Sequence, residues 1–200
     1  MDKVAAIVLA AGTSSRFSQG STKLVANFEG KPLVRHAVDA AMASLAFPVI
    51  VVTGHAREDV RTALHGAEVV FVHNRDYATG IASSLRSGLA SLPSSIEGAV
   101  ICLADMPRVT TSLIDLLIVS FGRSDRAHAI VPVHNRRRGN PVLVARALFE
   151  PIAMLTGDEG AKRFLNQPNT KVVEALVEDA GVLADIDTRE ALDACHAGAL

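Results

Sequence analysis

The sequence has few aromatic residues and almost no excess charge. It contains no Trp and one Tyr, and its formal net charge is −1 over 200 residues. Proteins that bind single-stranded nucleic acid stack bases on aromatic side chains, and nucleic-acid-binding domains present a basic surface. The composition therefore argues against a nucleic acid partner and favours a small-molecule one.

Cysteines and long apolar runs are also scarce. Cys102 and Cys195 are too few and too far apart for a disulfide framework or a thiolate metal site, and Cys102 lies in an apolar run typical of a core. No apolar run reaches the roughly 18 residues that span a bilayer, and the N-terminus lacks the features of a signal peptide. We expect a cytoplasmic protein with no membrane partner.

Short apolar, β-branched runs alternate with segments of helical pattern through the first two thirds of the chain. Buried strands are predicted at Val4–Leu9, Val49–Val52, Val69–Val72, Ala99–Leu103 and Ala129–Val133. Helices are predicted at Leu33–Leu45, Arg57–Leu64, Ser83–Leu92 and Ser112–Phe121. This alternation predicts an α/β fold of three layers, a mostly parallel twisted sheet with helices on both faces.

The pattern changes after Val133. The polar stretch His134–Gly139 and the apolar Asn140–Val144 predict a small hairpin excursion. Helical patterns at Arg146–Leu155 and Gly160–Asn166 and a strand at Lys171–Leu176 follow. We expect a single domain over residues 1–200, with a nucleotide-binding half over about 1–110 and an acceptor-binding half over about 111–200.

A loop of small residues follows the first predicted strand, with cations after it. The strand ends in Leu9, Ala10, Ala11 and Gly12, and Arg16 and Lys23 come next. The N–H groups of such a loop can surround phosphates, and the two cations can neutralise a triphosphate. The loop has no Gly-Lys-Ser/Thr and no three spaced glycines, so it is neither a P-loop nor a dinucleotide motif. A tight turn with two solvated cations is the alternative.

Six motifs along the chain resemble those of the MobA-like NTP transferases, the nucleotidyltransferases of molybdenum cofactor synthesis. These motifs are Leu9–Arg16 with Lys23-Leu24, Asn74–Leu85, Ala104–Pro107, Gly139–Leu143, Gly157–Ala161 and Asp185–Thr188. The resemblance implies the fold of nucleotide-diphospho-sugar transferases. It also implies that Arg16 and Lys23 bind the NTP phosphates, which gives them, with Asp105, catalytic roles.

Two aspartates are candidate ligands for Mg²⁺, the implied cofactor. Asp105 follows a buried strand, where its carboxylate would lie beside the first loop, and Mg²⁺ favours one or two carboxylates plus substrate phosphates. The resemblance makes Asp187 the second ligand, with Asp185 behind or beside it. The alternatives are helix N-caps: Asp105 is a poorer cap than Thr110 or Thr111, whereas Asp187 or Thr188 could cap a last helix. We expect Asp158 and Glu159 to cap the helix that follows them.

The resemblance assigns base and ribose recognition to Asn74, Gly80 and Ser83. An Asx turn followed by an ordinary N-cap is the alternative for this segment. Ala11 is typical of the family's cytidylyl branch, since the guanylyl branch has a glycine there. The implied nucleotide is therefore CTP, with other NTPs as the alternative.

The implied acceptor is the phosphate of a molybdopterin that carries molybdenum. Candidate acceptor-binding residues are Asn140, Pro141 and Arg138, although an arginine run in a loop can also be a solvated turn. A molybdoenzyme or its chaperone is the implied protein partner. The sequence departs from the family pattern at two places. Asn140 stands where a His is common, which concerns the acceptor. The interval from Arg16 to Lys23 is longer than in close relatives, which concerns the phosphate loop.

These features together predict a Mg²⁺-dependent nucleotidyltransferase that moves CMP from CTP to molybdopterin and releases pyrophosphate. Two alternatives stay open. One is a transferase of the same fold that uses another NTP or a sugar or isoprenoid phosphate. The other is an oxidoreductase or cofactor-binding protein on this scaffold, because a fold does not fix a function.

Overall fold

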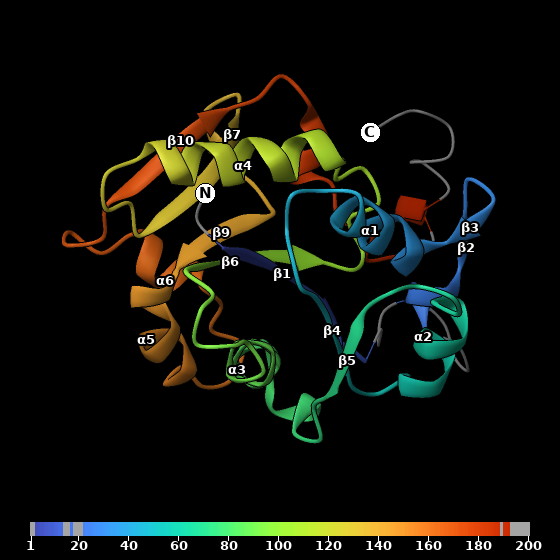
Figure 1. Ribbon diagram of the computed structural model, residues 1–200. Coiled ribbons are helices and arrows are strands. Elements are labelled where there is room, and N and C mark those ends of the chain that lie inside the picture. Colours follow the sequence, from blue (N-terminus) through green and yellow to red (C-terminus); the bar gives the residue numbers. More distant parts are fainter. Residues whose placement is uncertain (1–2, 14–16, 18–21, 189, 193–200) are drawn as a thin grey trace.

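A computed structural model describes residues 3–13, 17, 22–188 and 190–192 (Figure 1). The strands are β1 Val4–Ala10, β2 Asn27–Phe28, β3 Lys31–Pro32, β4 Val49–Thr53, β5 Val70–His73, β6 Gly98–Leu103, β7 Ala129–His134, β8 Arg137–Arg138, β9 Val142–Ala145 and β10 Val172–Leu176. The α-helices are α1 Leu33–Met42, α2 Arg57–Ala63, α3 Ile81–Ala90, α4 Thr111–Arg123, α5 Phe149–Ala153 and α6 Lys162–Leu165. Short 3₁₀ turns are η1 Lys23–Val25, η2 Tyr77–Thr79, η3 Arg146–Leu148 and η4 Ala180–Leu183.

The main sheet has eight strands in the order β10-β7-β9-β6-β1-β4-β5, with β8 paired to β7. β1 lies between β4 and β6 and runs parallel to both. Every residue of β1 is buried, as expected for a strand covered on both faces. All five strands and all four helices that the alternating pattern predicts are present, within a few residues at each end. The predicted α/β fold is confirmed.

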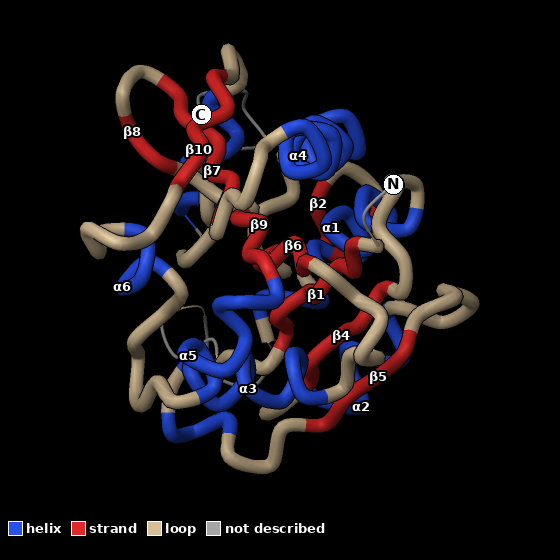
Figure 2. Tube along the Cα trace, turned by 60° about the vertical axis from the view of Figure 1, so that its left-hand side comes forward, coloured by secondary structure: helices blue, strands red, loops and turns tan. Residues whose placement is uncertain are grey.

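Helices cover both faces of the sheet, which gives the three predicted layers (Figures 1 and 2). One apolar core joins alternate residues of β1 to α1, α2 and α4, through residues such as Val8, Val38 and Leu117. The other core joins Ile7 and Leu9 of β1 to α3, α5 and α6, through residues such as Leu85. The alternation along β1 follows from the two-residue period of a strand.

The predicted hairpin excursion is real, but the strand within it belongs to the main sheet. β7 and β8 form a short antiparallel hairpin. The chain then enters β9, which is antiparallel to both β6 and β7 and lies between them. A parallel strand needs a crossover of about a dozen residues or more. The connection from β7 to β9 is shorter than this, so β9 runs antiparallel to β7.

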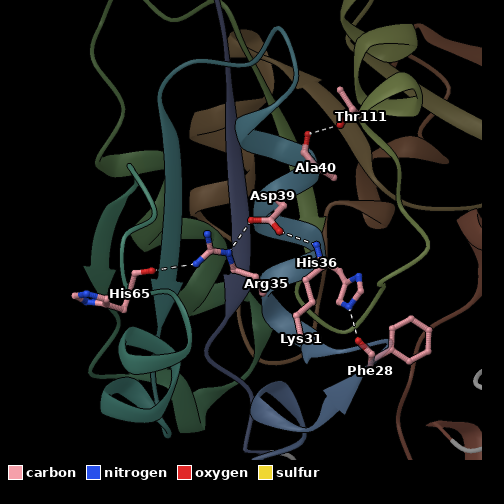
Figure 3. Close-up of polar contacts among 8 residues, drawn as sticks. All are labelled: Phe28, Lys31, Arg35, His36, Asp39, Ala40, His65 and Thr111. Carbon is pink, nitrogen blue, oxygen red and sulfur yellow. Dashed lines mark hydrogen bonds and ion pairs between the residues drawn. The ribbon is translucent and has the colours of Figure 1, made fainter.

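A polar network holds α1 to the segments around it (Figure 3). Its contacts are Lys31 Nζ to Asp39 Oδ2 (2.6 Å), Arg35 Nε to Asp39 Oδ1 (2.7 Å), Arg35 Nη1 to the His65 carbonyl (3.1 Å), His36 Nε2 to the Phe28 carbonyl (2.8 Å) and Thr111 Oγ1 to the Ala40 carbonyl (3.2 Å). Burial lowers the pKa of His36, so the ring is neutral near pH 7 and donates through Nε2. The network connects α1 to the β2–β3 hairpin, which follows η1 and its residue Lys23.

Candidate nucleotide site

Three segments that are far apart in the sequence meet at the carboxyl edge of β1 and β6. These strands are parallel neighbours in register, with Leu9 opposite Leu103. The glycine loop and Asp105 therefore leave the sheet side by side. The C-terminal segment joins them, because the Ile186 N–H donates to the Asp105 carbonyl at 3.0 Å. Parallel α/β sheets bind ligands at this edge.

Lys23 lies between the two aspartates that were predicted to bind metal. Its Nζ contacts Asp105 Oδ2 and Asp187 Oδ1, each at 2.7 Å. The Lys23 side chain is 11% exposed, against 21% for Asp105 and 40% for Asp187. Burial acts to lower the pKa of Lys23, but the two carboxylates outweigh it and raise that pKa, so the amine is charged. One cation thus bridges both carboxylates.

Threonines that follow the two aspartates provide helix caps. Thr110 is the N-cap of α4 and accepts from the Leu113 N–H at 3.2 Å. Thr188 accepts from the Ala191 N–H at 3.2 Å. Threonines therefore carry the capping roles that were the alternative for Asp105 and Asp187.

A cavity of about 560 Å³ opens over this cluster. Its lining residues are Leu9, Ala11, Gly12, Thr13, Lys23, Leu24, Tyr77, Ala78, Thr79, Gly80, Ile81, Ser84, Leu103, Asp105, Asp158 and Asp187. This volume is within the range of about 300–1,000 Å³ for small-molecule sites. Seven residues assigned to the nucleotide or metal thus share one cavity. Ala10 is buried at the end of β1 and does not line it, and Arg16 lies outside the described residues.

Asn74 and Ser83 support the cavity wall from behind. Asn74 is 2% exposed; its Nδ2 donates to the hydroxyls of Ser83 (2.8 Å) and Ser84 (3.0 Å), and its Oδ1 accepts from the Asp76 N–H (2.9 Å). The last contact is the Asx turn left open as an alternative. The buried amide is occupied within the protein, where it holds the wall in place, and its contact with the base stays a prediction. Ser84 lines the cavity in place of Ser83.

Gly80 fits against the loop that carries Asp158. Its φ of 107° and ψ of 173° belong to a region nearly restricted to glycine. A Cβ atom here would lie 2.2 Å from the carbonyl carbon and oxygen of Gly157. The Ala82 N–H also donates to the Gly157 carbonyl at 3.1 Å. The two segments are therefore in backbone contact.

Asp158 lines the cavity, whereas the sequence analysis expected it to cap a helix. The expected capping role is wrong, because α6 begins only at Lys162 and its N-cap, Ala161, makes no side-chain cap. Glu159 pairs with Arg163 instead. The glycines on either side of the acidic pair were the available signal for a loop that approaches a ligand.

The chain matches the MobA-like NTP transferase domain over residues 6–173. It belongs to this family. Among its relatives, nicotine blue oxidoreductase of Paenarthrobacter nicotinovorans is 27% identical over 94% of this chain and 93% of its own length. Molybdenum cofactor cytidylyltransferase of Escherichia coli K12 is 26% identical with the same coverage.

Among solved structures, Rv0371c from Mycobacterium tuberculosis superposes with a TM-score of 0.84 at 26% identity, covering 98% of this chain and 99% of its own. Its complex with manganese gives a TM-score of 0.79 at 25% identity, with 96% of each chain covered. The domain thus has the nucleotide-diphospho-sugar transferase fold, and a structure of this similarity holds a divalent metal.

The two carboxylates of this NTP transferase domain suit a divalent cation. Both oxygens lie within 2.7 Å of one charged nitrogen, so a single cation reaches both. In the described part of the chain, no group of three or more His, Cys, Asp or Glu side chains converges as a metal site. Mg²⁺ is commonly held by one or two carboxylates and completed by phosphate oxygens and water. The donor set therefore fits a metal that arrives with a nucleotide.

The three predicted acceptor residues of the domain do not line one common cavity. Asn140 lines a second cavity, next to the first, whereas Pro141 is buried and lines neither. Arg138 Nη2 pairs with Glu174 at 2.9 Å, and its Nη1 donates to the Leu165 carbonyl at 3.1 Å. Arg138 therefore connects β8 to β10 and α6, and its contact with the acceptor stays a prediction.

Two expectations from composition also have a structural answer. Cys102 is buried in β6, and burial raises the pKa of its thiol to about 12, so it is a core residue without thiolate chemistry. Within the described residues, no helix is long and apolar enough to cross a bilayer.

Proposed function

We propose that this protein transfers CMP from CTP to the phosphate of a molybdenum-bearing molybdopterin and releases pyrophosphate. The observation that supports it best is the contact of Lys23 with Asp105 and Asp187 beside the glycine loop, in one cavity. A nucleotidyltransferase needs these elements together: a loop for phosphates, a cation for their charge, and carboxylates for a metal. Residues 1–200 act as one domain, with the nucleotide on the half before about residue 110.

Each nucleotide-binding element has a distinct task. The N–H groups near Ala11 and Gly12 approach the phosphates, and Arg16 and Lys23 neutralise them. Lys23 exchanges its carboxylate partners for phosphate oxygens when the nucleotide arrives. Gly80 and Ser84 shape the wall at the base and ribose, while the buried Asn74 holds that wall in place.

The reaction is in-line attack of an acceptor phosphate oxygen on the α-phosphorus. The new P–O bond forms as the bond to the β-phosphate oxygen breaks, and pyrophosphate leaves with that electron pair. Asp105 and Asp187 would hold Mg²⁺, which supplies charge neutralisation at the triphosphate. Lys23 and Arg16 stabilise the charge that grows on the leaving group, and the cavity walls align the two phosphates.

CTP is the proposed nucleotide for two reasons. Ala11 lines the cavity where the guanylyl branch has a glycine. A relative at 26% identity over nearly the whole chain is a molybdenum cofactor cytidylyltransferase. The product would pass to a molybdoenzyme or its chaperone in the cytoplasm.

The similarity to nicotine blue oxidoreductase favours a second candidate, an oxidoreductase on the same scaffold. The two functions differ in their products. Nucleotidyl transfer releases pyrophosphate and needs no electron donor, whereas reduction consumes an electron donor and leaves an NTP intact.

The test has two steps. Thermal shift with CTP, GTP, ATP and UTP, each with and without Mg²⁺, identifies the nucleotide, because a ligand that binds only the native state stabilises it. Pyrophosphate release and product mass are then measured with the preferred NTP and molybdopterin. We expect a Mg²⁺-dependent shift with CTP and a cytosine dinucleotide product. A preference for GTP would overturn the prediction of CTP from Ala11. Reduction of a substrate without release of pyrophosphate would support the oxidoreductase.

A further inference from the structure

The acidic segment near the C-terminus lies between two loops that come from the two halves of the chain. We call this segment, residues 181–187, the C-terminal strap. Its Ile186 N–H donates to the Asp105 carbonyl at 3.0 Å, and its Val182 carbonyl accepts from the Asn140 N–H at 2.8 Å. The strap therefore connects the loop after β6, which carries one of the two aspartates, to the loop between β8 and β9 in the acceptor half.

Gly139 lies so close to the strap that a side chain has no room between them. A Cβ atom on Gly139 would lie 2.3 Å from the Val182 carbonyl oxygen and 2.9 Å from the Val182 carbonyl carbon. Both are backbone atoms, which cannot rotate away as the end of a side chain can. The φ of Gly139 is outside the left-handed region, so the close approach of two backbones, and not the local conformation, requires glycine here.

Gly181 makes a second close approach, against the loop after β6. A Cβ atom on Gly181 would lie 2.7 Å from the Arg108 Cβ and 3.2 Å from the Arg108 carbonyl oxygen. Further along the strap, Ile186 is buried in an apolar cluster with Phe28 of β2. The strap is thus in contact with both loops and with the β2–β3 hairpin, and these contacts determine where the next residue, Asp187, lies.

We propose that Gly139 is a positioning residue for Asp187: it admits the Val182 carbonyl, and the acceptor half thereby sets the place of a metal ligand. This inference rests on the proposed function, in which Asp187 holds Mg²⁺. Residues that orient a metal ligand typically change metal affinity by about 10–100-fold when they are mutated. Mg²⁺ demands near-octahedral geometry at about 2.0–2.1 Å, whereas Ca²⁺ accepts a flexible shell at about 2.3–2.6 Å. A displaced strap therefore weakens the binding of Mg²⁺ more than the binding of Ca²⁺.

The first test follows metal-dependent CTP binding by thermal shift, with Mg²⁺ or Ca²⁺ titrated at a fixed concentration of CTP. The proteins are the wild type, Gly139→Ala and, as the matched control, Gly98→Ala. Gly98 is also buried, and a Cβ there would lie 3.1 Å from the Phe121 ring, at the end of β6 away from Asp105. It therefore disturbs packing without touching the strap.

The second test needs no ligand. Urea unfolding in EDTA measures the loss of stability that Asp187→Asn causes in the wild type and in Gly139→Ala, because a double-mutant cycle detects whether two residues act together. Gly181→Ala goes through both tests as well. It acts on the strap from the other loop, so it carries the tests if Gly139→Ala does not fold.

We expect Gly139→Ala and Gly181→Ala to need about tenfold more Mg²⁺ than the wild type for half of the CTP-induced shift. The increase for Ca²⁺ should be smaller, and Gly98→Ala should match the wild type. The loss of stability caused by Asp187→Asn should fall to less than half in the Gly139→Ala background.

An unchanged Mg²⁺ requirement in Gly139→Ala would overturn the inference. An equal increase for Mg²⁺ and Ca²⁺, or an Asp187→Asn loss that is the same in both backgrounds, would overturn it too. A wild type that shows no metal-dependent shift with any NTP would instead refute the proposed function. The unfolding measurements would then decide alone whether Gly139 positions Asp187.

Discussion

Gly80→Ala tests how the nucleotide cavity is built. The substitution adds a single Cβ in a backbone region that costs a residue with a side chain about 1–3 kcal/mol. That Cβ would also lie 2.2 Å from two backbone atoms of Gly157 and 2.8 Å from the Asp158 nitrogen. Backbone cannot rotate away as a side chain can, so the Gly157–Asp158 loop must shift. We expect a loss of about 3 kcal/mol or more in the free energy of unfolding.

Gly66→Ala is the matched control for this experiment. Gly66 also has a positive φ, 77°, but a Cβ there has no heavy atom within 4 Å. It should cost only the left-handed backbone penalty of about 1–2 kcal/mol. Urea unfolding measures both losses, and CTP-induced thermal shift measures the cavity. Gly80→Ala should lose CTP binding and Gly66→Ala should keep it. Equal losses of stability, with CTP binding intact in both, would refute the proposed packing of the two loops.

Three further predictions concern single side chains. Lys23→Met leaves Asp105 and Asp187 without their bridging amine, so the free energy of unfolding in EDTA should fall by about 1–3 kcal/mol, less than for a fully buried pair because Asp187 is 40% exposed. Mn²⁺ should stabilise this variant more than it stabilises the wild type, and no response to Mn²⁺ would contradict the paired carboxylate site. His36 has a lowered pKa, so below about pH 6.5 the unfolded chain takes up a proton that the folded chain does not, and the free energy of unfolding falls as pH decreases. His36→Gln should flatten this pH dependence of stability between pH 7 and 5.5. An unchanged slope of stability against pH would exclude His36 as its source. In a Cys195→Ser background, Cys102, which is buried with a raised pKa, should react with a thiol reagent at pH 8 only after denaturant is added. Rapid labelling of that native variant would show that the β6 core opens.

The sequence was most informative where one local rule decides the structure. Continuous apolar runs identified strands buried on both faces, such as β1, and Asp105 could be placed because a carboxylate after a central strand must leave at the ligand-binding edge. The partnership of Asp105 with Asp187 came from resemblance to a family, since no local pattern relates Lys23 to residues that follow it by 82 and by 164 positions.

The sequence was least informative where packing between distant segments decides. The sequence predicts β9 as part of a hairpin. Its pairing with β6 on one side and with β7 on the other shows that it is a central strand. Asn74 looks like a polar ligand-binding residue, yet it is buried and its amide donates to Ser83 and Ser84. Asp158 reads as a cap, but the helix starts later and the loop instead packs on Gly80.

The central claim is that Asp105 and Asp187 form a metal-dependent nucleotide site with Lys23. Calorimetric titration of CTP with Mg²⁺ tests it most directly, with the wild type, Asp105→Asn, Asp187→Asn and Asp185→Asn. Asp185 is the matched control, because it is two residues from Asp187, exposed, and does not line the cavity. We predict Mg²⁺-dependent binding that is lost in Asp105→Asn and Asp187→Asn and kept in Asp185→Asn. Binding of the same strength in all four proteins, or in EDTA, would contradict the account.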